Sequence, residues 1–181
     1  FAKTVADGLT GTSTAAPAAS GPSCSSAISS STDLSGNDNA EKVFNFLKGK
    51  GLTPIQIAGI MGNLQAESGF NPGIEEKGTA RKDKGYGLAQ WTFGRRTNLE
   101  NYAAAAGKPA SDLGVQLEFL WSELNTGYKA RVLDVILASS SLEECTYVFL
   151  EKFEVPADIA GNKPIRLGFA QNILNQSWAK E

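Results

Sequence analysis

The pattern of apolar positions along the chain changes abruptly near residue 39. Before it, residues 1–38 are mostly Ser, Thr, Ala, Gly and Pro, a composition that buries too little apolar surface to offset the entropy of the chain. From Asn39 onward, apolar residues recur at helical spacing between residues that begin or end helices. We therefore predict a linker or stalk over residues 1–38 and one helical domain over residues 39–181.

Two helices are predicted at the start of this domain. Asn39 is the candidate N-cap of the first helix, which ends at Gly51. Thr53 followed by Pro54 predicts the start of the second, and Gly69 stands where a left-handed residue ends a helix. The apolar residues of the second helix fall on one face, and they are Ile57, Ile60, Met61 and Leu64.

A glycine-rich, charged stretch over residues 71–90 separates these helices from the others. It has no helical period, and we predict a loop with a short β-hairpin. One helix is expected from about residue 93 to 106 and another after Ser111, followed by two shorter ones and a last helix that Pro164 opens. The predicted fold class is mainly α with a small β-hairpin.

Composition limits the classes of partner. The chain has 17 basic and 19 acidic residues and a formal net charge of -2, with the two signs interspersed. Because no basic stripe is present, we expect no nucleic-acid partner. No apolar run approaches the roughly 20 residues that span a bilayer, and the first residues lack a signal-peptide pattern. We expect a soluble monomer with no membrane segment in this chain.

The absence of histidine restricts the chemistry. It excludes Ser-His-Asp and Cys-His hydrolases, most zinc hydrolases and imidazole proton transfer. Acid-base chemistry must therefore use carboxylates, Tyr, Lys or Cys. We expect no cofactor and no metal.

The two cysteines, Cys24 and Cys145, lie far apart and form no metal-binding motif. We favour a disulfide between the tail and the core, with two free thiols as the alternative. A disulfide would indicate an oxidising, extracytoplasmic setting.

Glu67 falls in the last turn of the second predicted helix, beside Ile60 at the edge of the apolar stripe. We expect it to be half-buried. Apolar neighbours and the negative end of the helix dipole both disfavour its charged form. A protonated carboxyl is what glycoside cleavage needs, although its position alone also fits an ordinary glutamate at a helix end.

Four motifs carry a resemblance to a known family. Residues 58–73 read AGIMGNLQAESGFNPG and residues 85–91 read GYGLAQW. A Glu-Ser pair closing a helix, followed by Gly-aromatic-Gly-Leu-x-Gln, resembles goose-type lysozymes and lytic transglycosylases. With LEFLW at residues 117–121 and FLEKFEVP at residues 149–156, the chain resembles the phage-tail lysozyme family more closely still.

The resemblance implies a lysozyme-like fold whose hairpin lines a sugar cleft. It implies cleavage of the β-1,4 bond between N-acetylmuramic acid and N-acetylglucosamine in peptidoglycan, with Glu67 as the general acid. The substrate-binding residues that it implies are Ser68, Tyr86, Gly87, Gln90, Trp91 and Thr92. Core packing is an equal alternative for Tyr86 and Trp91, and hydrogen bonding to backbone is the alternative for Gln90.

A second catalytic carboxylate is less well defined. Glu75, Glu76 and Asp83 are the candidates, and Asp83 is our choice, against the alternative of a solvated residue in a charged run. Goose-type enzymes carry an aspartate where this chain has Thr92. The acceptor therefore stays open: we rank hydrolysis by water ahead of attack by the muramoyl 6-hydroxyl, which is lytic transglycosylation.

Three further charged residues belong to these motifs or adjoin them. Glu154 repeats a family position, where it supports the floor of the cleft or caps a turn. Arg95 and Arg96 open the helix after Trp91, and a solvated helix face is favoured over contact with peptide carboxylates of the wall.

Two non-enzymatic functions are the alternatives: a peptidoglycan-binding module without chemistry, and a structural spacer. The glycine-rich loop argues against a spacer, which needs no concave loop. The expected location is secreted, in the cell envelope or on a phage tail particle.

Overall fold

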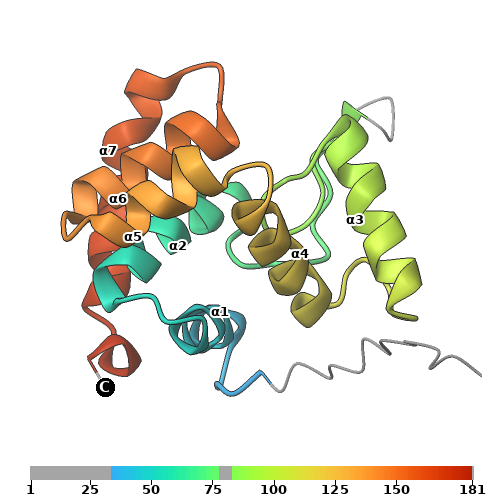
Figure 1. The fold of residues 1–181 in the computed structure, drawn as a ribbon, viewed down its shortest axis with the longest axis horizontal. Helices are drawn as coiled ribbons and strands as arrows, with labels where there is room; N and C mark the ends of the chain where they lie inside the picture. The colour runs from blue at the N-terminus through green and yellow to red at the C-terminus, as the bar shows by residue number, and fades with distance from the viewer. Residues whose placement is uncertain (1–33, 78–82, 181) are drawn as a thin grey trace, which may run out of the picture.

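The computed structural model describes residues 34–77 and 83–180, and these residues are mainly helical (Figure 1). The helices are α1 (Asn39–Gly49), α2 (Pro54–Ser68), α3 (Phe93–Ala105), α4 (Leu113–Asn125), α5 (Asp134–Ala138), α6 (Leu142–Phe149) and α7 (Ile159–Leu174). Single helical turns of other types, η2 (Lys129–Leu133), η3 (Leu150–Glu154) and η4 (Ser177–Ala179), precede α5, extend α6 and follow α7. In the described part of the chain, no helix is both long enough and apolar enough to cross a membrane.

The ends of α2 are those that the sequence predicts. The Thr53 hydroxyl accepts a hydrogen bond from the Gln56 backbone, and the Gln56 side chain accepts one from the Thr53 backbone. Pro54 occupies the first turn, where its missing N–H costs nothing. Gly69 ends the helix in the left-handed conformation, with a φ of 57°. Both boundaries are confirmed.

The predicted cap of α1 is wrong by one residue. Asp38 is the N-cap, and its carboxylate accepts a hydrogen bond from the Glu41 backbone N–H at 2.9 Å. Asn39 lies inside the helix, and its side-chain amide instead donates to the Phe70 carbonyl at 3.0 Å. This bond joins the start of α1 to the residue that follows the end of α2.

The predicted start of the last helix at Pro164 is also wrong. Asp158 caps α7, accepting a hydrogen bond from the Gly161 backbone N–H at 2.9 Å, and the helix begins at Ile159. Pro164 lies inside it and removes one backbone hydrogen bond. Pro164 and Ala160, whose carbonyl loses that bond, are both exposed, so solvent can replace it.

Helix α2 is the central element of the fold. It contacts α1, α6 and α7, and Figure 1 shows it passing behind α5 and α6. The sequence predicts one buried face, but α2 is buried nearly all round. Two glycines explain how neighbours come so close: a Cβ on Gly59 would lie 2.6 Å from the Cys145 Cβ, and one on Gly62 would lie 2.5 Å from the Arg166 carbonyl oxygen.

Helices α3 and α4 pack on each other, with the described residues of the loop between α2 and α3, 70–77 and 83–92, beside them (Figure 1). The predicted hairpin in this loop is not supported. Within the described residues, two isolated antiparallel bridges take its place, one between Glu75 and Tyr86 and one between Tyr86 and Trp91. Gly87 and Gln90 have φ values of 72° and 44°, and these left-handed residues turn the chain before either bridge extends into a ladder.

Candidate active site

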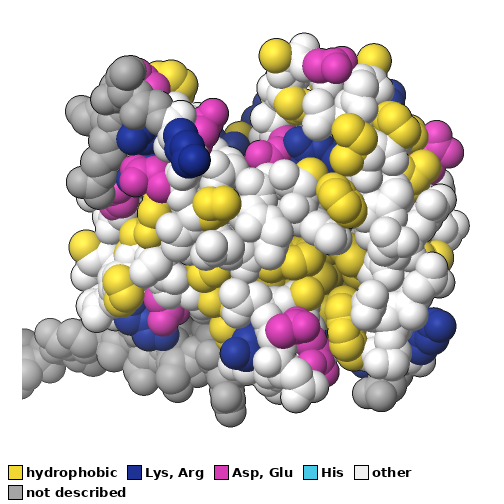
Figure 2. Space-filling model, turned by 180° about the vertical axis from the view of Figure 1, so that it is seen from behind, with side chains coloured by type: hydrophobic (Ala, Val, Ile, Leu, Met, Phe, Trp, Pro, Cys, Tyr) yellow, Lys and Arg dark blue, Asp and Glu magenta, His cyan; other side chains and the backbone are white. Residues whose placement is uncertain are grey.

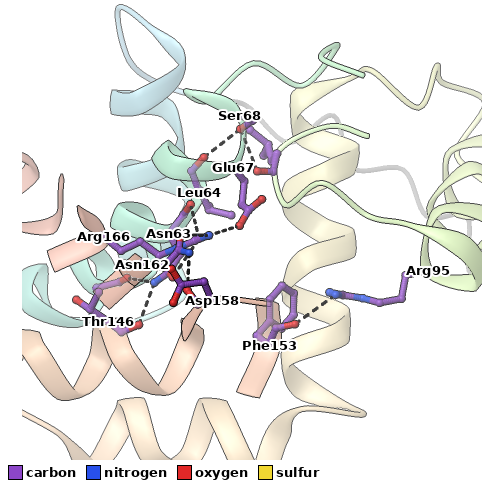
Figure 3. Close-up of polar contacts among 12 residues, drawn as sticks. Asn63, Leu64, Glu67, Ser68, Arg95, Thr146, Phe153, Asp158, Asn162 and Arg166 are labelled. Atoms are coloured by element: carbon purple, nitrogen blue, oxygen red, sulfur yellow. Dashed lines mark hydrogen bonds and ion pairs between the residues drawn. The ribbon is translucent and has the colours of Figure 1, made fainter. Parts of the chain in front are cut away.

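Glu67 lies in the last turn of α2 and faces α7 (Figure 3). Its side chain is 20% exposed, which confirms the expected half-burial. Its Oε1 accepts a hydrogen bond from Nη2 of Arg166 at 2.6 Å. The sequence analysis considered burial and the helix dipole at Glu67 and missed this partner, which lies 99 residues further along the chain.

Arg166 is itself held by polar residues of α2 and α7. Its side chain is 5% exposed, and Nη1 donates to the backbone and side-chain oxygens of Asn63 at 3.3 and 3.4 Å. The Asn63 amide donates to the carbonyls of Gly59 and Thr146 at 2.9 and 3.0 Å. Arg166 is also 3.4 Å from the side-chain oxygen of Asn162. These contacts join α2, α6 and α7 directly behind Glu67.

Glu154 is the second carboxylate near Glu67. It is the last residue of η3, and its Oε1 is buried and accepts no hydrogen bond from any described residue. Burial raises the pKa of Glu154 well above its ordinary range, and the charges of Glu67 and Glu123 raise it further, while Arg95 and Arg166 oppose the shift. Glu154 is therefore the residue of the site that burial and charge favour as a neutral acid.

The backbone on both sides of Glu154 is fixed. Arg95 on α3 donates to the Phe153 carbonyl at 3.4 Å (Figure 3), and its guanidinium lies 4.3 Å from the centre of the Phe153 ring. On the other side, the Val155 N–H donates to the Leu150 carbonyl at 2.8 Å, with Val155 in the left-handed region at a φ of 51°. Glu154 thus has little freedom to leave its position.

Ser68 is buried and supports the loop, and its predicted contact with substrate stays a prediction. Its hydroxyl lies 2.9 Å from the Leu88 carbonyl and 3.1 Å from the Leu64 carbonyl. Gln116 of α4 supports the same segment, because it accepts a hydrogen bond from the Leu88 N–H and donates to the Pro72 carbonyl. Sequence analysis missed Gln116, whose one signal is an amide between apolar residues at the start of α4.

Trp91 and Tyr86 differ in exposure. Trp91 is fully buried, packs edge-on against Phe119 at a centroid distance of 5.5 Å, and donates its indole N–H to Glu123 at 2.7 Å. The core alternative is therefore favoured for Trp91, which has no surface to offer a sugar. Tyr86 is half-buried, with the Arg96 guanidinium 4.8 Å from its ring centre.

Gly87, Gln90 and Thr92 shape the backbone of the loop. A Cβ on Gly87 would lie 2.5 Å from the Gln116 amide, so only glycine fits there. The Gln90 side chain donates to the Gly87 carbonyl at 2.9 Å, which is the backbone role that the sequence left as an alternative. Thr92 precedes α3 and makes no side-chain capping bond. Contact of these three residues with substrate stays a prediction.

None of the three predicted candidates for the second carboxylate contacts Glu67 among the described residues. Glu75 forms an ion pair with Arg96 at 2.7 Å, and Glu76 accepts a hydrogen bond from the Gly85 N–H at 3.1 Å. Asp83 is exposed. Its catalytic role stays a prediction, and its exposure agrees with the alternative of a solvated residue.

The two arginines at the start of α3 do not form a solvated face, and that expectation is wrong. Arg96 is 3% exposed and pairs with Glu75 and Glu100. Arg95 is partly buried and binds both carboxylate oxygens of Glu123 at 2.8 and 2.9 Å. Each arginine has a carboxylate partner on another part of the chain, which periodicity does not reveal.

The surface is hollowed between the part of the molecule that carries α7 and the part that carries α3 (Figure 2). Charged side chains of both signs lie in this hollow. Arg166 comes from α7 and Arg95 from α3, with the ends of α2 and η3 between them (Figure 3). The two carboxyl groups at this place, those of Glu67 and Glu154, come from the last turn of α2 and the end of η3.

Comparison with known proteins agrees with the sequence motifs. The family model described as phage tail lysozyme matches residues 38–176. The chain belongs to the phage tail lysozyme family. It is similar to morphogenesis protein 1 of Bacillus phage B103, with 31% identity over 135 residues, which cover 71% of this chain and 36% of that protein. The chain thus spans about a third of the length of this relative.

The phage tail lysozyme match includes Glu67, Glu154 and Arg166 but excludes Cys24, which lies outside the described residues. Cys145 on α6 is fully buried and makes no disulfide within the described residues. The pairing of the two cysteines stays a prediction. In the same described part of the phage tail lysozyme domain, no group of three or more His, Cys, Asp or Glu side chains is placed to hold a metal ion.

Backbone strain is concentrated near the residues of this phage tail lysozyme site. The described non-glycine residues with positive φ are Phe70, Gln90, Phe93 and Val155. Phe70 lies two residues after the end of α2, and Val155 follows Glu154. Gln90 precedes α3, and Phe93 is the first residue of that helix. Such conformations are unfavourable for residues with a Cβ and gather at functional sites.

Proposed function

We propose that this protein cleaves the glycan strands of peptidoglycan, at the β-1,4 bond between N-acetylmuramic acid and N-acetylglucosamine, with Glu67 as the general acid. Membership of the phage tail lysozyme family supports a peptidoglycan-degrading enzyme in general. The observation that carries the finer proposal is the half-buried carboxyl of Glu67 in the last turn of α2, which Arg166 of α7 binds.

The chemistry requires a proton on the departing sugar. A glycosidic oxygen leaves poorly until it is protonated, and a carboxyl group held at the bond supplies that proton. Arg166 binds Oε1 of Glu67 and fixes the direction of the carboxyl group. The other oxygen, Oε2, forms no hydrogen bond or ion pair with a described residue and is the atom proposed to meet the substrate.

Lytic transglycosylation is the second candidate reaction, and one observation favours it. Glu75 and Glu76 bind other parts of the protein, and Asp83 is exposed. No contact between these three residues and Glu67 supports a base for water, which favours a path that needs none. Attack by the muramoyl 6-hydroxyl on the same sugar needs no separately bound water. It would give 1,6-anhydromuramoyl ends in place of reducing ends.

The experiment is to incubate the protein with purified peptidoglycan and to identify the released fragments by mass spectrometry. Reducing muropeptides indicate hydrolysis and anhydro-muropeptides indicate transglycosylation. Glu67→Gln should lower the rate by roughly 100-fold or more, the usual effect of removing a general acid. Glu143→Gln, an exposed glutamate of α6, is the matched control and should retain the wild-type rate.

Two results would overturn the proposal. Release of no fragments by the wild type, with retained binding to the wall, would identify a peptidoglycan-binding module. An equal rate for wild type and Glu67→Gln would exclude Glu67 as the acid. The proposed location is the phage particle or an extracytoplasmic compartment, where a peptidoglycan substrate is accessible.

A further inference from the structure

Glu123 lies near the end of α4 and binds two segments of the chain with one carboxylate. Its Oε1 accepts a hydrogen bond from Nε of Arg95 at 2.8 Å, and its Oε2 accepts one from Nη2 of Arg95 at 2.9 Å. Oε2 also accepts the indole N–H of Trp91 at 2.7 Å. The Glu123 side chain is 13% exposed, so these three charge-assisted bonds are largely shielded from water and hold their partners firmly.

The bond to Trp91 connects Glu123 to the loop before α3. The backbone N–H and carbonyl of Trp91 pair with those of Tyr86, both at 3.1 Å, and this pairing closes the turn that contains Gly87 and Gln90. Trp91 is fully buried, so its indole cannot shift without repacking its neighbours. The Glu123 carboxylate thus fixes one end of this turn.

The bonds to Arg95 connect the same carboxylate to η3, which ends at Glu154. The Arg95 guanidinium donates to the Phe153 carbonyl at 3.4 Å and lies 4.3 Å from the centre of the Phe153 ring (Figure 3). Because the guanidinium is planar and bonds to both carboxylate oxygens of Glu123, its direction toward Phe153 is set by Glu123.

The backbone of Glu123 adds a third connection. Its carbonyl accepts a hydrogen bond from the Tyr128 N–H at 3.1 Å, and the Tyr128 ring packs on the Phe153 ring at a centroid distance of 4.7 Å. The Arg95 guanidinium lies 5.2 Å from the centre of the Tyr128 ring, so it is within cation–π range of both rings. The side chain and the backbone of Glu123 therefore both lead to Phe153.

The turn over residues 86–91 and the end of η3 both adjoin Glu67. The Ser68 hydroxyl lies 2.9 Å from the carbonyl of Leu88 in the turn, and Ser68 follows Glu67 in α2. Glu154 is near enough to Glu67 for the charge of Glu67 to raise the pKa of Glu154. A shift of either segment would therefore change the surroundings of the proposed acid.

The elements that carry these two segments pack on different neighbours. Helix α3 packs on α4, whereas η3 packs on α6, α7 and η2. Arg95 carries a contact from α3 to η3. We therefore expect a change at Glu123 to alter the spacing between the turn and η3 more than it alters the packing within either part.

We propose that Glu123 is a positioning residue of the candidate active site, which holds the turn over residues 86–91 and the end of η3 at a fixed spacing around a peptidoglycan glycan strand. The inference rests on the proposed function and deepens it by naming a residue that acts through Trp91 and Arg95. Catalysis depends steeply on such spacing, because a displacement of about 1 Å can lower a rate by roughly 100-fold.

Glu123→Gln keeps the size of the side chain and removes its charge. Its amide nitrogen is a donor, so the side chain cannot accept all three hydrogen bonds in this geometry. We expect kcat on soluble, uncrosslinked glycan strands of peptidoglycan to fall by roughly 10-fold to 100-fold, because the acid stays present but misaligned. KM should change less than kcat.

Glu123→Asp separates position from charge, because it keeps the negative charge and shortens the side chain by one methylene. We expect kcat to fall by roughly 10-fold, whereas a role of the charge alone would keep the wild-type kcat. Glu118→Gln is the matched control. It removes another carboxylate of α4, one that pairs with Lys50 at 3.1 Å, and should retain the wild-type kcat and KM.

Backbone amide resonances report the two segments without any activity. In ¹H–¹⁵N spectra of the whole chain, Glu123→Gln should shift the amides of residues 86–91 and of residues 153–155. Glu118→Gln should leave both sets in place. A residue that only satisfied its two partners would move the resonances of Trp91 and Arg95 and no others.

Arg95→Lys is the second variant and leaves Glu123 and Trp91 bonded to each other. Lysine keeps the positive charge but lacks the planar fork that binds both oxygens of Glu123. We expect the amides of residues 153–155 to shift, the indole N–H of Trp91 to keep its resonance, and kcat to fall by roughly 10-fold. This variant tests the same connection if Glu123→Gln does not fold.

The outcomes separate the two proposals. Absence of cleavage by the wild type, together with amide shifts in both segments of Glu123→Gln, would overturn the proposed function and leave Glu123 as the residue that sets their spacing. Amide shifts confined to Trp91 and Arg95 would overturn the inference. A wild-type kcat in both Glu123→Asp and Arg95→Lys would overturn it as well.

Discussion

Arg166 is the residue on which the geometry of Glu67 depends most directly. It connects the carboxyl group to Asn63 one turn earlier on the same helix and to Asn162 on its own helix. A buried arginine with these contacts fixes the direction of Glu67 because the planar guanidinium bonds in defined directions. The position of the Glu67 carboxyl is thus set by α7 as well as by α2.

Replacing Arg166 with Met keeps much of the volume and removes the donors. We expect Arg166→Met to lower the free energy of unfolding by roughly 1–3 kcal/mol, because Glu67 and the Asn63 carbonyl lose their partner in a partly buried place. Lys129→Met is the control, since Lys129 and Asp134 are about half exposed and such pairs contribute roughly 0–1 kcal/mol. Urea unfolding measures both, and equal losses would contradict the assigned role.

Individual residues differ in how far the sequence reveals them. The half-burial of Glu67 could be predicted because its helix position and its motif lie in one continuous stretch, and its catalytic role stays a prediction. Arg166 and Gln116 were missed because each makes its contacts with segments far away in the chain. For Glu154 the position was noticed, but its buried oxygen depends on elements that local pattern cannot bring together.

Close packing of α7 on α2 depends on one glycine. The backbone of α7 passes so near Gly62 that an added Cβ would meet the Arg166 carbonyl and Ala170. The atoms that face Gly62 from α7 are two backbone atoms and the Cβ of Ala170, and none of these can rotate away from an added Cβ. The approach of Arg166 to Glu67 therefore requires a residue without a side chain at this position.

Gly62→Ala should destabilise the protein by roughly 1–3 kcal/mol through overpacking, although alanine is the better helix former. Gly168→Ala on α7 is the matched control, because an added Cβ there meets nothing within 4 Å. It should stabilise by roughly 0.5–1 kcal/mol. Thermal unfolding measures both variants. A lower melting temperature for Gly62→Ala and a higher one for Gly168→Ala confirm the packing argument, and changes in the same direction contradict it.

The sequence predicts the helices better than it predicts the loop between them. Caps and glycines mark both ends of α2, and these signals are local. Pro164 is misleading because proline is tolerated inside an exposed helical turn. Among the described residues of the loop, 70–77 and 83–92, Gln116 and Ser68 bind the backbone and no strand ladder forms. Side-chain support of this kind leaves no periodic pattern in the sequence.

The chain as a whole contains one cysteine in the packed domain and one outside the described residues. Cys145 has no exposed surface and packs against the backbone of Gly59, which favours a free thiol over a disulfide with Cys24. Alkylation in denaturant without reductant should then add two labels, measured as mass. A disulfide would instead give labelling only after reduction, which would contradict this expectation.

The strained residues near the site have a consequence for altering the protein. Phe70, Gln90, Phe93 and Val155 each hold a conformation that glycine or asparagine adopts more easily. Substitution by glycine or asparagine at these positions is a standard way to raise the thermal stability of a protein. Because the same residues set the course of the backbone around Glu67 and Glu154, replacing them for stability would change the part of the molecule that we propose as the active site.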